Sequence, residues 1–291
     1  MPPIPLIAAE QPPLPEDQLS FTNQASRMTV PVSIGERGPY EFVVDTGAQR
    51  TVVSRDLAGL LGLKSGRTVR VTAMTNQALV GTAIVPALKL SKTAAATIEA
   101  PALNQADMGA PGMLGIDALQ GQSVSIDFDR NEMTVRPSRK RISAPASPNE
   151  IVVTARSRFG QLIVTNASYH GKHISVVVDT GTPITIANRA FVAMLDHQPK
   201  SLGKVDLISA LGQLMNADYI AVDRISIGGI TFHDVPMAVN DAEPFRRFDL
   251  ADQPALLLGM DSLRLFRNIQ IDFANREIRF SMPRPAQMAA N

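Results

Sequence analysis

The amino-acid sequence predicts an all-β protein, mainly β-strands with short helices, built as two homologous lobes that meet at one site. The first observation is a repeated motif: residues 42–48 (Phe-Val-Val-Asp-Thr-Gly-Ala) recur as residues 176–182 (Val-Val-Val-Asp-Thr-Gly-Thr). The second is that strand-like runs, bounded by Gly, Pro and Asn, follow each copy in the same order. The motif aspartates, Asp45 and Asp179, are 134 positions apart (179 − 45).

The first motif is expected at the end of a β-hairpin. Residues 28–34 and 40–44 are strand-like, and the Gly- and Pro-containing residues between them favour a turn. Asp45 then ends the second strand, and Gly47 allows the backbone to turn sharply without a Cβ clash. The pattern therefore predicts a carboxyl group on a rigid loop at a strand end.

A short helix is expected after each motif. Ser54 is a favourable N-cap residue, and Gly62 ends the apolar pattern that follows it. Asn188 stands at the equivalent position of the second copy (188 − 54 is again 134). The apolar residues at helical spacing are Leu57, Leu60 and Leu61 in the first copy and Phe191, Met194 and Leu195 in the second.

Each half also contains a strand pair that could fold over a ligand as a flap. The strand-like runs are residues 68–74 and 79–85 in the first half, and 205–211 and 219–222 in the second. An ordinary surface hairpin stays open as the alternative, because a short polar turn is weak evidence by itself. The predicted flap tips are Met74, Thr75 and Asn76 in the first half and Leu211, Gly212 and Gln213 in the second.

A second motif, two apolar residues followed by Gly, is also present twice. Residues 113–117 (Met-Leu-Gly-Ile-Asp) recur as residues 257–261 (Leu-Leu-Gly-Met-Asp), 144 positions later (261 − 117). A helix-like stretch and a hairpin follow each copy, and Asp117 and Asp261 are expected to cap those helices. A repeat this long is unlike a solenoid and indicates an internal duplication.

Segments outside the repeat suggest the domain boundaries. Residues 1–26 are expected to be a Pro-rich, poorly ordered lead-in, since residues 1–19 contain six prolines. The lobes would span residues 27–136 and 151–283. Residues 137–150 would be a basic, Pro-rich linker, and residues 284–291 a tail.

The composition argues against some classes of binding partner but does not determine the cellular compartment. The 28 Lys and Arg residues against 27 Asp and Glu give a formal charge of +1, so neither nucleic acid nor an anionic membrane is expected as the main partner. The absence of Cys excludes disulfides and thiolate metal sites. No apolar run reaches the roughly 18 residues of a membrane span. Either a cytoplasmic location or, slightly favoured, a periplasmic or secreted one after signal removal is compatible with the sequence.

The repeated motifs resemble those of the aspartic proteases. The shared pattern is two apolar residues before Asp-Thr-Gly, a later apolar-apolar-Gly, and a flap hairpin between them, all present twice. The form Asp45-Thr46-Gly47-Ala48 and the short lobes are most similar to the bacterial retroviral-like, or retropepsin-like, branch. The resemblance covers residues 28–280 and implies two retropepsin- or pepsin-like β-barrel lobes with the active site at their junction.

The resemblance also implies roles for individual residues. Asp45 and Asp179 would be the catalytic pair, one ionised as a general base toward water and the other protonated toward the scissile carbonyl oxygen. Thr46 and Thr180 would hydrogen-bond across the lobe junction. The supporting residues would be Gly47, Ala48, Gly181 and Thr182 in the loops, with Gly115 and Gly259 packed behind them. No metal or cofactor is required by this chemistry.

One difference between the copies predicts that the two carboxyl groups are inequivalent. The hydroxyl of Thr182 can donate to Asp179, whereas Ala48 offers no such donor to Asp45. Because a hydrogen bond to the ionised form lowers a pKa, the lower pKa is predicted for Asp179. An activity optimum at mildly acidic pH is expected.

Two functions remain under consideration from the sequence alone. The favoured one is an endopeptidase that cleaves extended polypeptides and works as a monomer, because both lobes belong to one chain. The alternative is a peptide-binding or scaffold protein that keeps the fold and the cleft without useful turnover. Asp45→Asn and Asp179→Asn variants would separate the two hypotheses.

Overall fold

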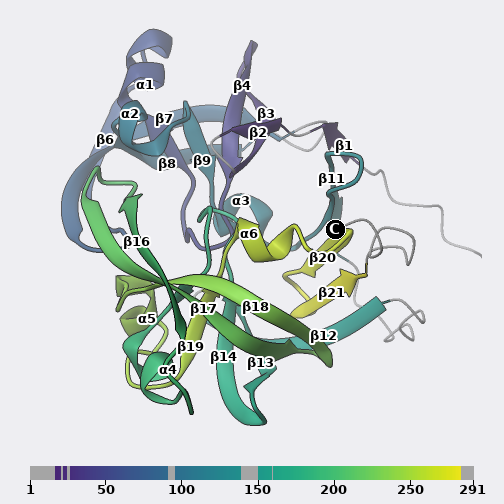
Figure 1. The fold of residues 1–291 in the computed structure, drawn as a ribbon. Coiled ribbons are helices and arrows are strands. Elements are labelled where there is room, and N and C mark those ends of the chain that lie inside the picture. The colour runs from purple at the N-terminus through teal and green to yellow at the C-terminus, as the bar shows by residue number, and fades with distance from the viewer. Residues whose placement is uncertain are drawn as a thin grey trace, which may run out of the picture.

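A computed structural model of the chain shows two β-sheets and a few short helices, which confirms the predicted all-β class (Figure 1). The structure describes residues 17–20, 22–24, 27–90, 96–138, 150–158 and 160–282. In Figure 1 the N-terminal half, purple to blue, lies above the green and yellow C-terminal half. In the described part of the chain, no helix is both long and apolar enough to cross a membrane.

The first sheet is formed by eight strands of the N-terminal half, in the order β2-β3-β4-β9-β5-β8-β7-β6. The bounds are β2 Thr22–Gln24, β3 Arg27–Ile34, β4 Arg37–Val44, β5 Val52–Ser54, β6 Ser65–Thr72, β7 Gln77–Lys89, β8 Ala96–Leu103 and β9 Gly112–Leu114. The antiparallel pairing of β3 with β4 confirms the predicted hairpin that leads to Asp45.

The second sheet has thirteen strands, in the order β1-β11-β10-β20-β21-β12-β13-β14-β19-β15-β18-β17-β16. From the first half come β1 Asp17–Ser20, β10 Gln122–Asp127 and β11 Glu132–Pro137. The others are β12 Glu150–Arg158, β13 Gln161–Tyr169, β14 Lys172–Val178, β15 Ile186–Ala187, β16 Lys200–Ile208, β17 Leu214–Ile227, β18 Ile230–Val239, β19 Ala255–Leu258, β20 Asn268–Asp272 and β21 Glu277–Ser281.

The helices are short and follow the expected capping chemistry at the two repeated positions. Their bounds are α1 Arg55–Leu61, α2 Gln105–Met108, α3 Ile116–Leu119, α4 Arg189–Ala193, α5 Glu243–Arg247 and α6 Met260–Leu263. The Ser54 side chain accepts from the Leu57 N–H, and that of Asn188 accepts from the Phe191 N–H. Gly62 ends α1 in the left-handed conformation, at a φ of 64°, as the sequence predicted.

The two halves repeat the same strand arrangement around their aspartates. In the first half β4 lies parallel to β9, with Val44 opposite Leu114. In the second half β14 lies parallel to β19, with Val178 opposite Leu258. These β-branched and leucine side chains are buried, as expected for strands covered on both faces. The internal duplication predicted from the motifs is therefore visible in the topology.

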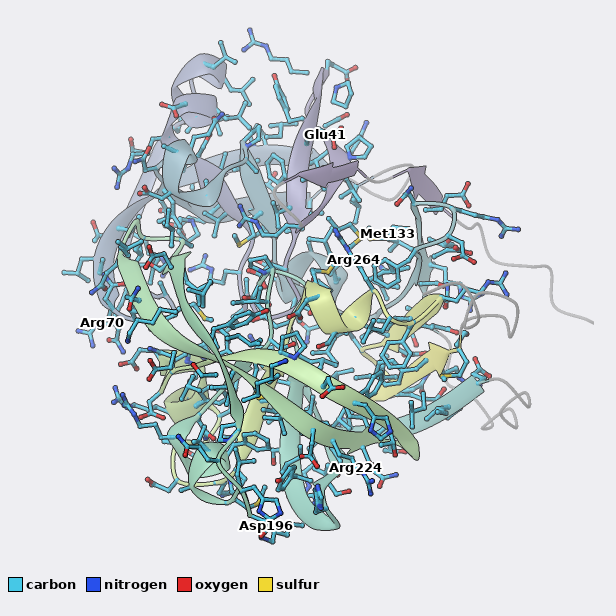
Figure 2. All side chains as sticks on the ribbon, viewed as in Figure 1. Glu41, Arg70, Met133, Asp196, Arg224 and Arg264 are labelled. Atoms are coloured by element: carbon cyan, nitrogen blue, oxygen red, sulfur yellow. The ribbon has the colours of Figure 1, made fainter. Side chains whose placement is uncertain are left out.

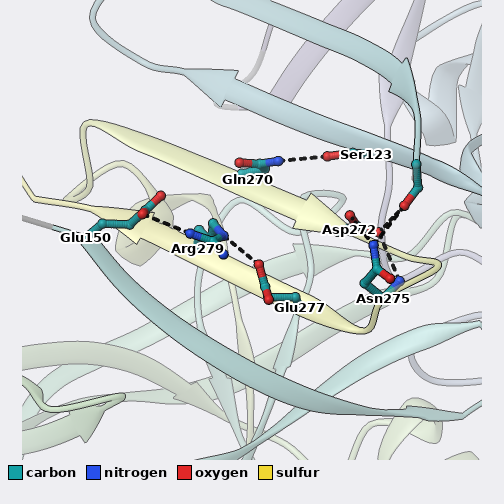
Figure 3. Close-up of polar contacts among 8 residues, drawn as sticks. Ser123, Glu150, Gln270, Asp272, Asn275, Glu277 and Arg279 are labelled. Atoms are coloured by element: carbon teal, nitrogen blue, oxygen red, sulfur yellow. Dashed lines mark hydrogen bonds and ion pairs between the residues drawn. The ribbon is translucent and has the colours of Figure 1, made fainter. Parts of the chain in front are cut away.

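Strand pairing between β10 and β20 joins the two halves. Val124 of β10 lies opposite Ile271 of β20, and the backbones pair over five positions. Side chains add polar bonds to this seam: Gln270 donates to the Ser123 hydroxyl at 2.9 Å (Figure 3). Ser138 donates to Asp272 at 2.6 Å. The C-terminal hairpins of both lobes thus form one continuous part of the larger sheet.

A buried cation stabilises the same region. Arg279 on β21 is only 4% exposed, and its guanidinium donates to Glu150 at 3.0 Å and to Glu277 at 2.5 Å (Figure 3). Glu150 begins β12, so this ion pair connects the first strand of the second half to the last. Two carboxylates offset the cost of burying one guanidinium.

The segments predicted as a lead-in, a linker and a tail are described only in part. Two short stretches of the expected lead-in are strands: β1 pairs with β11, and β2 pairs with β3. The lead-in was expected to be extended and poorly ordered; these two stretches are extended and pair with the edges of existing sheets. Residues 139–149 of the linker and 283–291 at the C-terminus lie outside the described residues. The proposed domain boundaries stay predictions.

Candidate active site

The two Asp-Thr-Gly loops face each other at the junction of the halves. A Cβ atom added to Gly181 would lie 2.2 Å from Cγ of Asp45. In the same way, a Cβ atom on Gly47 would lie 2.6 Å from Cγ of Asp179. Each carboxyl group therefore packs against the glycine of the opposite loop, where any side chain would displace it.

Backbone N–H groups hold both carboxyl groups in place. Oδ1 of Asp45 accepts from the N–H groups of Gly47 and Ala48, both at 2.8 Å. Oδ1 of Asp179 accepts from the Gly181 N–H at 2.9 Å. The two carboxyl groups also share a hydrogen bond with each other, which requires a proton on one of them.

The surroundings raise the pKa of both carboxyl groups by unequal amounts. Burial raises the pKa of Asp45, but the Ala48 and Gly47 N–H groups and the charge of Arg27 act in the opposite direction. Burial and the charge of Asp45 together raise the pKa of Asp179 well above its usual range. At intermediate pH the pair therefore shares one proton and carries one negative charge, and the larger rise in pKa is at Asp179.

This order of pKa values is opposite to the sequence-based prediction. The hydroxyl of Thr182 donates to the Ile184 carbonyl at 3.2 Å and not to Asp179. The hydroxyl of a Thr can bond to a nearby backbone carbonyl in this way. The Thr182 hydroxyl is therefore not available to the carboxyl group of Asp179. The backbone N–H groups of Ala48 and Thr182 each lower the pKa of their own aspartate, so the hydroxyl of Thr182 adds no difference between the two copies. The asymmetry was predicted correctly, but its direction was wrong.

Thr46 and Thr180 bind across the junction, as expected. The Thr46 hydroxyl donates to the Val178 carbonyl at 2.8 Å, and the Thr180 hydroxyl donates to the Val44 carbonyl at 2.7 Å. Each hydroxyl also accepts from the other threonine's backbone N–H at 3.1 Å. Both side chains are buried, so this symmetric set of bonds fixes one loop against the other.

Gly115 and Gly259 pack behind the loops. A Cβ on Gly115 would lie 2.5 Å from the carbonyl carbon of Arg50, and one on Gly259 would lie 2.4 Å from that of Ile184. The next N–H after each glycine donates to a loop carbonyl, that of Ala48 or Thr182. Close contact with backbone therefore requires glycine at both positions.

Asp117 and Asp261 support the loops and do not act as helix N-caps, contrary to the prediction. The N-cap residues are Gly115 and Gly259, without a side-chain cap bond. Asp117 accepts from the Thr51 N–H at 2.8 Å and from its hydroxyl at 2.7 Å. Asp261 binds Thr185 in the same two ways. Thr51 and Thr185 were missed, although their spacing of 134 marks them as a repeated pair.

A cavity of about 530 Å³ lies above the two carboxyl groups, a volume within the usual range for ligand sites. Its floor includes Asp45, Asp179 and the adjacent loop residues. Residues of the hairpins β6–β7 and β16–β17, both at the left of Figure 1, also line the cavity. Of the predicted flap residues, Met74 and Thr75 line the cavity; in the second hairpin Ser209 and Ala210 line it instead.

The other contacts of the predicted flap residues lie between the two hairpins or within their turns. Gln213 accepts a hydrogen bond from the Thr75 hydroxyl at 2.8 Å, which joins the two tips. Leu211 packs against an apolar cluster of the first half, whereas Met74 packs against one of the second half. Asn76 closes the first turn by accepting from the Ala73 N–H at 2.9 Å. Each tip therefore reaches across to the other lobe.

Two further residues near the loops were not predicted. Arg27, at the start of β3, lines the cavity, and its charge acts on Asp45. Gln161, at the start of β13, is fully buried and donates through Nε2 to the Gly47 carbonyl. The two positions are also 134 apart, so the repeat could have revealed them. In the described residues, no group of three or more His, Asp or Glu is arranged to hold a metal ion.

Comparison with known families gives one match in each half. Residues 30–121 match the gag-polyprotein aspartyl protease family, and residues 165–262 match the Aspartyl protease family. A comparison with curated proteins gave no match. The two matched segments each contain one Asp-Thr-Gly loop and one flap hairpin. With a matching family in each of its two β lobes, the chain belongs to the retropepsin-like aspartic proteases.

Proposed function

We propose that this protein is an aspartic endopeptidase that hydrolyses peptide bonds in extended polypeptides. The observation that carries the proposal is the Asp45–Asp179 pair, two carboxyl groups with separated pKa values on the floor of a covered cavity. Groups with separated pKa values can act as base and acid in one step. The family match supports a protease function in general.

The proposed roles follow from the two environments. Asp45, ionised, takes a proton from a water molecule, whose oxygen then attacks the peptide carbonyl carbon. Asp179, protonated, donates its proton to the carbonyl oxygen, so the tetrahedral intermediate forms without separated charge. Asp45 then transfers its proton to the leaving nitrogen, the C–N bond breaks, and Asp179 recovers its proton from the hydroxyl. No covalent bond to the enzyme forms.

The cavity favours an extended substrate. Flap tips that close from above leave a channel between the hairpins and the loops, in which a strand-like peptide can bond to backbone groups. Both carboxyl groups come from a single chain, which supports activity as a monomer. A specific activity that stays constant on dilution is expected, whereas a fall with dilution would indicate assembly.

The proposed function is tested by digestion of a peptide library with wild type, Asp45→Asn and Asp179→Asn, with cleavage sites identified by mass spectrometry. Each single substitution is expected to lower cleavage by about 10²–10⁴-fold, the usual contribution of one acid or base. Asp206→Asn is the matched control, because this aspartate lines the same cavity but binds Asn216. Cleavage that persists in both variants would disprove the mechanism. Peptide binding without cleavage by wild type would favour the scaffold hypothesis.

A further inference from the structure

Arg27 brings an extra positive charge to the floor of the cavity. Its side chain lines the cavity together with Asp45, and Nη2 donates to the Met108 carbonyl. Partial burial lowers the pKa of Arg27, and the charge of Asp45 opposes that shift. A guanidinium has five N–H donors, so one carbonyl acceptor leaves most of its hydrogen-bonding capacity unused.

Among the described residues, Arg27 has no carboxylate within ion-pair distance. Asp107 is next to its acceptor Met108 in the sequence, yet the Asp107 carboxyl group lies against the second flap. A Cβ on Gly212 would be 2.6 Å from Oδ2 of Asp107. Burying a cation without an ion pair is costly unless another function requires it. Arg27 therefore lines the cavity with an incomplete set of acceptors among the residues that the structure describes.

Comparison of the two lobes shows that the fold does not require a charge at this position. The equivalent residue of the second lobe is Gln161, which is neutral and donates to the Gly47 carbonyl of the opposite loop. Arg27 does not reproduce that bond, because it binds Met108 of its own lobe. Of these two equivalent residues, only Arg27, which acts on Asp45, carries a positive charge.

The cavity as a whole also favours a negative partner. Apart from the Asp45–Asp179 pair, its lining contains the four arginines Arg27, Arg50, Arg70 and Arg247 and the two aspartates Asp107 and Asp206. Arg70, labelled in Figure 2, lies on the strand β6 of the first flap. Focused positive charge in a cleft raises the local concentration of an anionic ligand.

We propose that Arg27 is a specificity-determining residue that selects polypeptides with an acidic side chain close to the cleaved bond. The inference rests on the proposed endopeptidase function. A carboxylate can form two parallel bonds with a guanidinium, which also fixes its position. Such a direct contact is needed to offset the repulsion between the substrate carboxylate and ionised Asp45. The neutral amide of a Gln side chain forms weaker bonds at the same place.

The test compares peptides that differ only by Glu or Gln next to the cleaved bond. Wild type is expected to cleave the Glu peptide with a kcat/KM about ten- to a hundredfold higher, the range for a hydrogen-bonded charge. In Arg27→Gln this ratio should fall to about one, and in Arg27→Lys it should be intermediate. Any effect of Arg27 on the pKa of Asp45 is common to both peptides and cancels in the ratio. Arg70→Gln is the control for a general loss of cavity charge and should keep most of the preference.

A binding measurement separates failure of this inference from failure of the proposed function. In the Asp179→Asn background, fluorescence anisotropy gives the Kd of each labelled peptide without cleavage. The Glu peptide should bind more tightly, and Arg27→Gln should remove the difference. If wild type cleaves nothing but this difference is present, the role of Arg27 in recognising the acidic side chain holds and the proposed function fails. Equal values for both peptides, or a preference that survives Arg27→Gln, would overturn the inference.

Discussion

Thr46 and Thr180 exchange hydrogen bonds across the lobe junction, with each backbone N–H 3.1 Å from the other residue's hydroxyl oxygen. Each hydroxyl also donates to a carbonyl of the opposite strand, that of Val178 or Val44. The two threonines therefore fix the positions of Asp45 and Asp179 relative to each other. Their removal should affect stability and activity together.

Replacement of either threonine by valine is expected to destabilise the protein. Thr46→Val keeps the side-chain shape but leaves a buried carbonyl and a buried N–H without partners, at a cost of about 2–5 kcal/mol. Thr46→Ser keeps the hydroxyl and should cost only about 1 kcal/mol, for the lost methyl group. Urea unfolding measures both values. Equal losses for the valine and serine variants would show that packing, and not hydrogen bonding, holds the loops.

The raised pKa of Asp179 predicts a specific dependence of stability on pH. Burial and the charge of Asp45 raise this pKa above about 3.9, the usual value for Asp. At a pH between the usual value and the native one, the folded state holds a proton that the unfolded state has released. In that window the free energy of unfolding falls as pH rises. Asp179→Asn carries no such proton and should lack this component.

The measurement is urea unfolding of wild type and Asp179→Asn over a pH series. The stability of the variant relative to wild type should increase as pH rises through the window and level off above the native pKa of Asp179. The difference between the two proteins cancels the titrating residues outside the Asp45–Asp179 pair and therefore reports the proton that the pair shares. A difference independent of pH, or one that decreases as pH rises, would contradict the raised pKa and the shared proton of the pair.

Local features of the fold could be predicted from sequence because their causes are local. Ser54 and Gly62 bound α1 through their own capping geometry, and the turn before residue 40 joins β3 and β4. Strands β8 and β18 were not predicted, because their pairing partners β7 and β17 lie in long hairpins whose register depends on the whole lobe. The β10–β20 seam joins residues more than 140 positions apart.

The site could be predicted where the two copies of the repeat match. It could not be predicted where the direction of a side chain decides which group it binds. Asp45 and Asp179 stand in matching motifs, so their meeting at the junction could be expected. The hydroxyl of Thr182 was assigned to Asp179, but a nearer acceptor at Ile184 binds it. Arg27 matches Gln161 only in its position in the repeat, and the two side chains differ, so only the folded lobe shows that Arg27 acts on Asp45.

Gly115 is expected to tolerate no side chain. A Cβ there would lie 2.5 Å from the backbone of Arg50, which cannot move without shifting the loop, so Gly115→Ala should cost about 1–3 kcal/mol and lower activity. Gly59 is the matched control, since it lies in α1 with open space around its Cα. Gly59→Ala should stabilise the protein by about 0.5–1 kcal/mol. Equal effects in thermal unfolding would mean that the loop adapts.

The bond between the flap tips predicts a role in substrate binding more than in stability. Thr75 donates to Gln213 at 2.8 Å in an exposed contact that links the two hairpins above the cavity. Loss of one such bond, worth about 0.5–1.5 kcal/mol, should lower kcat/KM by about two- to tenfold in Thr75→Val, mainly through KM. Thr75→Ser keeps the donor and should stay close to wild type.

A double-mutant cycle with Gln213→Met distinguishes this bond from a general disturbance of the flap. If the two side chains act through their mutual bond, the first substitution already removes that bond, and the second should add little. The coupling energy should then be close to the free-energy loss of one single substitution. Because Thr75 lies on β6–β7 and Gln213 on β16–β17, such coupling would mean that the two hairpins close together. Strictly additive effects on kcat/KM would instead mean that each hairpin closes independently.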